Sequence, residues 1–279
     1  MALTPISLVE RTPELASPPT VYNKLASMLN DDNSSAEHIS AVINTDPALT
    51  VRLLKIVNSA FYGFPSQIST ISRAITIIGT TELTNLVLAT SVINTFKDIP
   101  DSLINVDEFW HQSLSCAIAS TYIAKQCGQR ATERFFILGL LHNIGSLVLY
   151  QTLPELSKQA LMAARFDNEP MHQAEKRIIG FDHTEVGRAL SQAWHLPLSI
   201  EEAIRFHHSP SEAKNFPTET AIVHLADIIV GIARQGEDSP VPIESEAWDL
   251  LQLSTDVLPE ILHQMNEQLE NITSVMLDS

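Results

Sequence analysis

The residues best able to do chemistry in this chain are five histidines and one aspartate between residues 111 and 227. Imidazole is the commonest protein ligand for Fe, Mn, Ni or Zn, and a carboxylate helps to balance the charge of the ion. The candidate metal ligands are His111, His142, His183, His207, His208 and Asp227. Unlike an HExxH helix, this set has no short spacing that fixes its geometry. Each residue could instead be structural or solvated, so the chemistry depends on a fold that brings them together.

One of these histidines lies in a strongly apolar environment. The stretch from Phe135 to Tyr150 reads FFILGLLHNIGSLVLY and is interrupted by the polar pair His142-Asn143. Polar side chains buried among Leu, Ile and Phe cost free energy unless they find hydrogen-bond partners or a metal. His142 is therefore either a hydrogen-bonded core histidine or part of a site. Gly145, just after the pair, is predicted to permit close approach of another helix.

Apolar residues follow helical spacing along nearly the whole chain, without persistent alternation of period two, and this pattern predicts an all-α fold. Several helix starts are marked by capping residues. The predicted caps are Asp46 before Pro47, Ser34 with Glu37, Asp107, and Asp182 with Glu185. The last cap places His183 in the first turn of its helix, Gly180 ends the preceding helix, and Pro210 stops the helix that leads into His207 and His208.

Composition limits the class of protein. The chain has 279 residues, is 44% hydrophobic and carries a formal net charge of −16, which argues against binding to a nucleic-acid backbone. It contains no run of about 18 apolar residues and no secretory signal at its start, so we expect a cytoplasmic protein that does not enter a membrane. Cys116 and Cys127 lack zinc-site spacing and are predicted to be reduced core thiols on one helix.

A polar connection at residues 97–106 is the best candidate for an internal boundary and hinge. It divides an N-terminal helical subdomain, residues 1–100, from a second subdomain, residues 101–234. A linker over residues 235–242 leads to an acidic helical extension that ends at residue 279. No Lys or Arg follows Arg234, so this extension presents an acidic surface.

The chain resembles the HDOD domain, the HD-related output domain of bacterial signalling proteins, over residues 14–230. The NSAFYG block at residues 58–63 is more specific than any histidine-containing piece. The matching stretches are PPTVYNKLASML (18–29), DPALTVRLLKIVNSAFYG (46–63), ISTISRAITIIGTTELTNLVL (68–88), LGLLHNIGSLVL (138–149) and FDHTEVGRALSQAWHLPLSIEEAIRFHHSP (181–210). The resemblance implies an N-terminal helical subdomain packed on an HD-like subdomain, and signal output through binding of a partner.

The order of the candidate ligands also resembles the ligand series of HD-superfamily phosphohydrolases, in particular the HD-GYP branch. The chain departs from that series at Asn143, where active HD enzymes carry the aspartate that bridges two ions. Asn offers only a neutral oxygen and cannot supply a negative bridge. The GYP loop is also missing, because Ser-Pro-Ser-Glu follows His207-His208. The resemblance therefore implies a degenerate metal site.

Three hypotheses follow. The first is a non-catalytic signalling module that docks a protein partner or a nucleotide between its subdomains. The second is a metal-dependent phosphohydrolase acting on a nucleotide or cyclic dinucleotide, with one or two ions of Fe, Mn, Ni or Zn. In that case His111, His142 and Asp227 hold the first ion, and Arg188 and Arg205 supply positive charge for the ligand. His183, His207 and His208 then serve a second ion or contact phosphate. The third is a helical scaffold with structural histidines and no metal.

Overall fold

The computed structural model describes residues 3–12, 15, 17–29, 31, 34–96, 99, 103–235 and 244–277, and every regular element among them is a helix. The predicted all-α fold is confirmed. Much of the predicted connection at 97–106 and almost all of the predicted linker at 235–242 lie outside the described residues.

The helices form two compact units. Unit 1 comprises Met1–Ser17 and Asp98–Gln264, and unit 2 comprises Pro18–Lys97 and Met265–Ser279. The predicted domain bounds differ from these units at both ends of the chain. The first residues group with the later part of the sequence, and the C-terminal boundary falls inside one helix, α16 (Leu258–Leu277).

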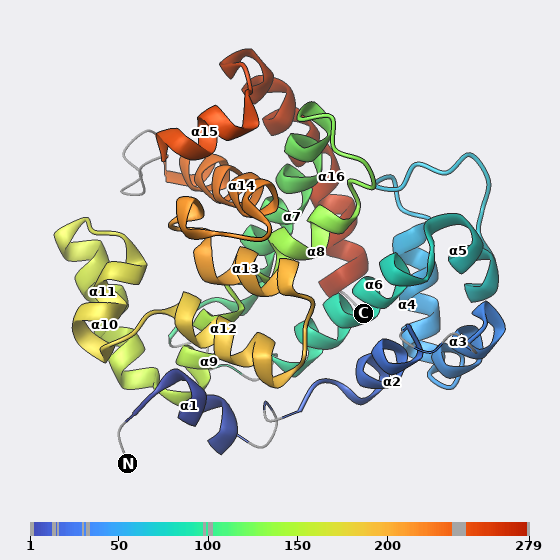
Figure 1. Cartoon of the computed structure of the whole chain (residues 1–279), viewed down its shortest axis with the longest axis horizontal. Coiled ribbons are helices and arrows are strands. Elements are labelled where there is room, and N and C mark those ends of the chain that lie inside the picture. The colour runs from blue at the N-terminus through green and yellow to red at the C-terminus, as the bar shows by residue number, and fades with distance from the viewer. Residues whose placement is uncertain are drawn as a thin grey trace. The chain divides into compact units, whose positions relative to one another are not determined.

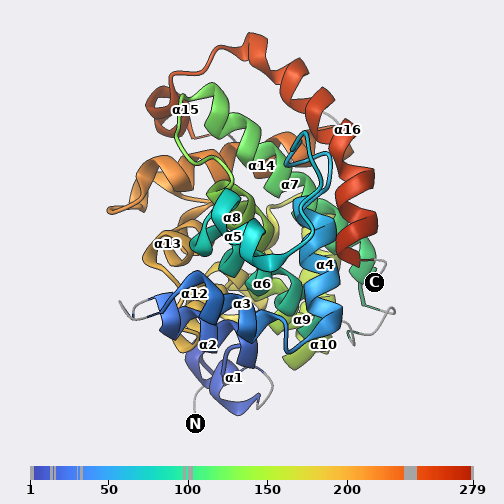
Figure 2. The ribbon, with the colours of Figure 1, turned by 90° about the vertical axis from the view of Figure 1, so that its right-hand side faces the viewer.

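Unit 2 is built from five helices and the end of α16. Its complete helices are α2 (Thr20–Leu29), α3 (Ala36–Ile43), α4 (Pro47–Val57), α5 (Ile71–Ile78) and α6 (Thr80–Thr95). Helix α6 packs against α2, α4 and α5, and both ribbon views show α4 beside it (Figure 1, Figure 2). The predicted cap Asp46 is confirmed, because its Oδ1 accepts a hydrogen bond of 3.0 Å from the backbone N–H of Leu49. The predicted Ser34–Glu37 cap is wrong by one residue, since Ser35 and His38 form the reciprocal pair.

Unit 1 contains the remaining helices and every candidate metal ligand. Its elements are α1 (Pro5–Arg11), α7 (Val106–Gln126), α8 (Arg134–Leu141), α9 (Ile144–Thr152), α10 (Pro154–Asp167), α11 (Met171–Ile179), α12 (His183–Ala193), α13 (Leu198–Phe206), η1 (Pro210–Glu212), α14 (Pro217–Gln235), α15 (Ser245–Leu251), η2 (Thr255–Val257) and the start of α16. Helix α7 packs on both α8 and α14, and α9 packs on α12 (Figure 1).

The apolar stretch of the sequence becomes two buried helices, α8 and α9, joined at His142 and Asn143. Residues Arg134–Thr152 have the length and apolar character of a membrane-crossing helix, but 83% of that window is buried inside the structure. Helices α5 and α6 pass the same test together, but they are bent by 117°. The expected absence from membranes and the expected location in the cell stay predictions.

Gly145 allows α9 and α12 to approach closely. A Cβ on Gly145 would overlap the carbonyl oxygen of His183, and Gly187 faces it from α12, where an added Cβ would lie 3.4 Å from the backbone nitrogen of Gly145. The predicted role of Gly145 is therefore confirmed. The contact sets the start of α9, where Asn143 lies, directly against the start of α12, where His183 lies.

The start of α7 and the burial of one of its cysteines differ from the predictions. Asn105 caps the helix by accepting a hydrogen bond of 3.0 Å from the N–H of Glu108, so Asp107 lies inside the first turn. Cys116 and Cys127 are free thiols, but only Cys116 is buried, because Cys127 ends the helix in a half-buried position.

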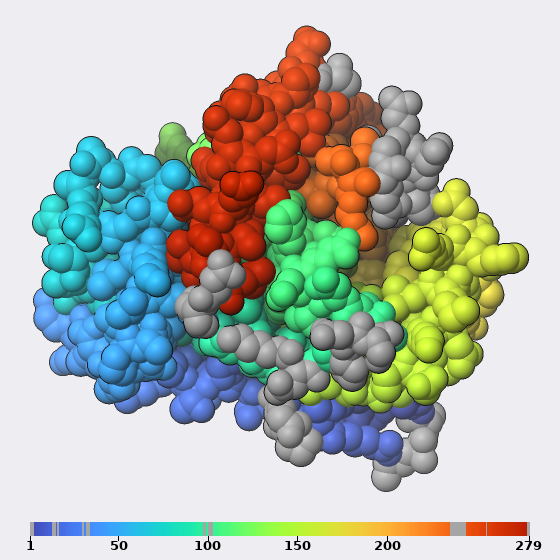
Figure 3. All heavy atoms as spheres, turned by 180° about the vertical axis from the view of Figure 1, so that it is seen from behind, coloured from blue at the N-terminus to red at the C-terminus, as the bar shows by residue number. Residues whose placement is uncertain are grey.

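Helices α10 and α11 pack against each other, and their yellow surface forms an outer edge of unit 1 in the space-filling view (Figure 3). Asn168 ends α10 in a left-handed conformation, and Gly180, with φ of 100°, ends α11 as predicted. This pair matters for the site because α11 carries Glu175, which contacts His183 on α12, and His172, which stacks on His208 after the end of α13.

Candidate metal centre

Five of the six predicted ligands converge within unit 1. His142 follows the last residue of α8, His183 is the first residue of α12, and His207 and His208 follow α13. Asp227 extends from the middle of α14. Their ligand atoms form two groups, within each of which all atoms lie no more than 4.8 Å apart. The groups are His142, His207 and Asp227, and His183, His207 and His208.

Helix ends fix the orientation of two of these histidines. The last carbonyl groups of a helix lack partners within the helix. His142 Nδ1 lies 2.6 Å from the carbonyl oxygen of Gly139, and His207 Nδ1 lies 2.9 Å from that of Ile204. A carbonyl only accepts, so in both rings Nδ1 carries the proton and donates. When either ring is neutral, its Nε2 therefore presents a lone pair, as is typical of metal-ligating histidine.

The first group combines two imidazoles with a carboxylate. His142 Nε2 lies 3.3 Å from Asp227 Oδ1, and the rings of His142 and His207 stand edge to face with their centroids 5.0 Å apart. Burial lowers the pKa of His142, but Cys116 and Asp227 outweigh it and leave that pKa well above its ordinary value. Burial acts to raise the pKa of Asp227, yet the neighbouring imidazoles hold it at about 2. The carboxylate is therefore ionised and can balance the charge of a cation.

The second group consists of imidazoles alone. His183 Nε2 lies 3.1 Å from His208 Nε2, and the ring of His208 also stacks on that of His172, with centroids 4.3 Å apart. Burial and the other imidazoles lower the pKa values of His207 and His208 well below the ordinary value. Both rings are therefore neutral near pH 7, which is the form that binds metal.

Buried polar atoms around both groups lack partners. Among the described residues, His207 Nε2, His208 Nδ1 and Asn143 Oδ1 are buried and accept no hydrogen bond. A buried polar atom left without a partner costs about 1–3 kcal/mol. An ion at His207 Nε2 would remove that cost. The ligand separations of 3.1 and 3.3 Å also fit the edge of about 3.3 Å expected for four ligands about 2.0–2.1 Å from zinc. The residues fit a transition-metal ion.

His207 belongs to both groups and limits how many ions it can serve. Its Nδ1 is committed to Ile204, so only the Nε2 lone pair remains for a metal. One lone pair binds one ion. The two groups therefore share one ligand atom, and an ion held through His207 by one group would leave the other with two ligands.

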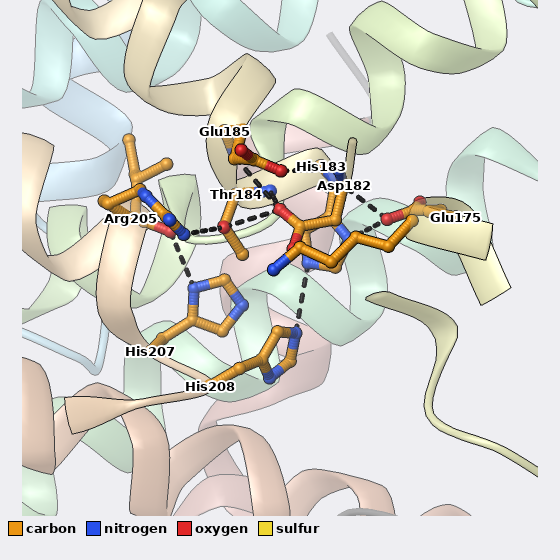
Figure 4. A network of polar contacts seen from close by, with 10 residues as sticks. Glu175, Asp182, His183, Thr184, Glu185, Arg205, His207 and His208 are labelled. Atoms are coloured by element: carbon orange, nitrogen blue, oxygen red, sulfur yellow. Dashed lines mark hydrogen bonds and ion pairs between the residues drawn. The ribbon is translucent and has the colours of Figure 1, made fainter. Parts of the chain in front are cut away.

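Three of the predicted site residues have other surroundings. His111 is exposed on α7 and belongs to neither group, so the structure does not bring it to the other ligands. Arg188 is about half exposed and pairs with Glu201 at 3.0 Å. Arg205 donates to Thr184 Oγ1 at 2.7 Å, beside His183 in the close-up view (Figure 4).

Two residues of the site were missed by the sequence analysis. Glu175 accepts hydrogen bonds from His183, and His172 stacks on His208. Both come from α11, whose sequence MHQAEKRII carries no motif that links it to the ligand series. Another histidine, His224, lies nearby, but both of its ring nitrogens are hydrogen-bonded: Nδ1 donates to His207 O at 2.7 Å and Nε2 accepts from the N–H of Glu244. His224 is therefore structural.

Comparisons with known proteins bear on the family and the fold. Residues 15–210 match the family described as the HDOD domain. An uncharacterised protein of Treponema pallidum (strain Nichols) is 28% identical over 224 residues, which make up 78% of this chain and 43% of that protein. This chain thus spans less than half the length of that relative.

Solved structures show the same fold. An HDOD domain protein of unknown function from Geobacter sulfurreducens is 24% identical, with a TM-score of 0.72 over 92% of this chain and 91% of that one. A Shewanella amazonensis SB2B protein, named as a conjectured phosphohydrolase, is 24% identical, with a TM-score of 0.76 over 97% and 98%. A conjectured signal transduction protein from Marinobacter aquaeolei VT8 is 18% identical, with a TM-score of 0.74 over 99% and 62%. Because the family match extends over most of its length, the chain belongs to the HDOD domain family.

Proposed function

We propose that this protein is a signalling module whose HD-like centre binds one transition-metal ion without dinuclear phosphohydrolase activity. The observation that carries the proposal is His207 Nε2, a buried lone pair without a donor that is shared by both ligand groups. Fe, Mn, Ni and Zn are all compatible with imidazole and carboxylate ligands.

The chemistry of Asn143 supports a role other than two-ion hydrolysis. Its Oδ1 is buried and unpartnered at the junction of α8 and α9, where active HD enzymes carry a bridging carboxylate. A neutral amide oxygen balances no metal charge and cannot bridge two cations. His207 is also limited to one ion. In this proposal a protein partner or a nucleotide binds according to whether the site holds its ion, and no bond is hydrolysed there.

The first test is the metal content of protein purified without an affinity tag or chelator, measured by elemental mass spectrometry. We expect about one equivalent of Fe, Mn, Ni or Zn, since three chain ligands can hold one ion. His207→Ala should lose the ion because it removes a ligand from both groups. The matched control is His111→Ala, which should keep it. Wild-type protein that stays below about a tenth of an equivalent after incubation with these metals contradicts the proposal and favours a purely structural histidine cluster.

Metal-dependent hydrolysis of a nucleotide or cyclic dinucleotide is a second candidate function. It is favoured by the two-histidine, one-carboxylate group, whose Asp227 side chain is 24% exposed and so accessible to a ligand. An ion held there would lower the pKa of a bound water and polarise a phosphate. In this case His142 and Asp227 would keep their ligand roles, and Arg205 would contribute positive charge.

Asn143→Asp separates the two candidate functions. If the site is a degenerate enzyme with intact geometry, the restored carboxylate should raise metal occupancy above that of the wild type and produce phosphodiesterase activity on cyclic dinucleotides. Unchanged metal content and no activity would show that the geometry for a second ion is absent as well. Wild-type protein that already hydrolyses these substrates would replace the signalling proposal with the enzymatic one.

A further inference from the structure

Glu175 carries a carboxylate that is fully buried beside the candidate metal centre. Its side chain is 0% exposed, and it reaches from α11 to the first residue of α12. Its Oε2 accepts a hydrogen bond of 2.6 Å from His183 Nδ1 and another of 2.9 Å from the backbone N–H of His183 (Figure 4). An ionised carboxylate removed from water needs such partners, because its burial otherwise costs far more than that of a neutral group.

These contacts fix the state of the His183 ring. Because the carboxylate accepts the Nδ1 proton, the neutral ring presents the Nε2 lone pair, which faces His208. A carboxylate that accepts the Nδ1 proton of a metal-ligating histidine fixes the orientation of the ring and strengthens it as a ligand.

The two ligand groups differ in charge. The first group contains Asp227, whereas the second consists of His183, His207 and His208. Asn143, at the position that carries a carboxylate in active HD enzymes, adds no charge. Through its contact with His183, Glu175 can give the all-imidazole group a negative charge that does not itself occupy a coordination position.

We propose that Glu175 is a positioning residue that holds His183 as an Nε2 ligand and supplies the negative charge of the all-imidazole group. This inference rests on the proposed metal binding. It makes the all-imidazole group a competent site for a divalent ion, and it extends the site to α11.

The alternative is a purely structural role, in which Glu175 only joins α11 to α12. The variant Glu175→Gln distinguishes this structural role from the positioning role. A glutamine carbonyl oxygen can take the place of Oε2 and accept both hydrogen bonds, while the amide nitrogen takes the place of Oε1, which has no partner among the described residues. The variant thus keeps the shape of the contact and removes its charge. Glu175→Ala removes both.

The experiment measures the affinity of the metal-free protein for Zn²⁺ and Co²⁺ by competition with a chelator. We expect Glu175→Gln to bind about 10-fold more weakly and Glu175→Ala up to about 100-fold more weakly, the range seen when such partners of metal-ligating histidines are removed. The Co²⁺ absorption spectrum should change in both variants, because the ligand field of His183 changes. Nitrogen-15 NMR of the metal-free protein should show the Nδ1–H form of His183 in the wild type and its loss in Glu175→Ala.

Glu202→Gln is the matched control. Glu202 is also a buried glutamate of unit 1, but its carboxylate accepts hydrogen bonds from Asn215 and Phe216. Its loss should lower stability without changing metal affinity. Glu175→Gln with wild-type affinity and spectrum, in a protein where His183→Ala weakens binding, overturns the positioning role. Equal losses in Glu175→Gln and Glu202→Gln overturn it too, as a general effect of stability. A wild-type protein that binds neither ion refutes the proposed metal binding itself.

Discussion

At the scale of single residues, the centre is defined by which ring nitrogen each histidine leaves available. His142 and His207 use Nδ1 to satisfy helix-end carbonyls, and His183 uses Nδ1 to satisfy Glu175. His224 has the same chemistry but both nitrogens engaged. A sequence cannot distinguish these cases, because all four are simply histidines in helical, apolar surroundings. The distinction comes from the carbonyl, carboxylate or N–H that each ring meets in the fold.

The residue scale also yields a prediction about His208. Its ring contributes only to the all-imidazole group, whereas Asp227 contributes only to the other group. If Glu175 directs the ion to the imidazoles, His208→Ala should weaken Zn²⁺ binding by at least about tenfold, a loss of about 1.4 kcal/mol, because it removes a ligand. Asp227→Asn should weaken it less. The opposite order in a competition titration would place the ion at the carboxylate group.

At the scale of elements, the helix ends that carry the ligands were partly predictable. Asp182 and Glu185 form the predicted reciprocal cap, which places His183 at the start of α12. Ligands at helix termini therefore follow from local signals. The contribution of α11 does not, since Glu175 reaches His183 through tertiary packing. His111 was included because of its place in the ligand order, but the exposed position that α7 gives it was not visible in that order.

The close approach of α9 and α12 leads to a stability prediction. Gly145→Ala places a methyl group into the backbone of His183, where neither helix can yield without displacing the other. We expect a loss of about 3 kcal/mol or more, at the upper end of the cost of overpacking. Gly128→Ala is a suitable comparison, because its Cβ meets no atom within 4 Å and only its φ of 67° is unfavourable. Chemical denaturation should therefore show the larger loss for Gly145→Ala, and equal losses would mean that the helices separate readily.

At the scale of the whole molecule, the apolar pattern was enough to predict the all-α fold class. It did not predict the unit to which each end of the chain belongs. Met1–Ser17 joins unit 1 through tertiary contacts such as the hydrogen bond from Trp194 Nε1 to the carbonyl of Leu15. The boundary between the units inside α16 could not be predicted for the same reason. A continuous helical pattern does not show at which residue the helix passes from one unit to the other.

The two units also predict how the metal acts on stability. An ion that binds the folded centre stabilises it by about 2.7 kcal/mol at a free concentration of 100 times Kd. All the ligands belong to unit 1, so the thermal transition of that unit should move to higher temperature on addition of Zn²⁺ and return on addition of EDTA. Calorimetry with His207→Ala as control checks this, and an equal shift in that variant would indicate non-specific binding.

Because His207 is shared, an ion bound at this centre would act as a movable cross-link. Held by the first group, it would join the α8–α9 junction, through His142, to α14, through Asp227. Held by the second, it would join the start of α12, through His183, to the segment after α13. His207 is the pivot in both positions, and each provides three ligands from the chain. A shift of the ion from one group to the other would therefore release one pair of elements and join the other pair. Such a change would transmit a signal without any hydrolysis.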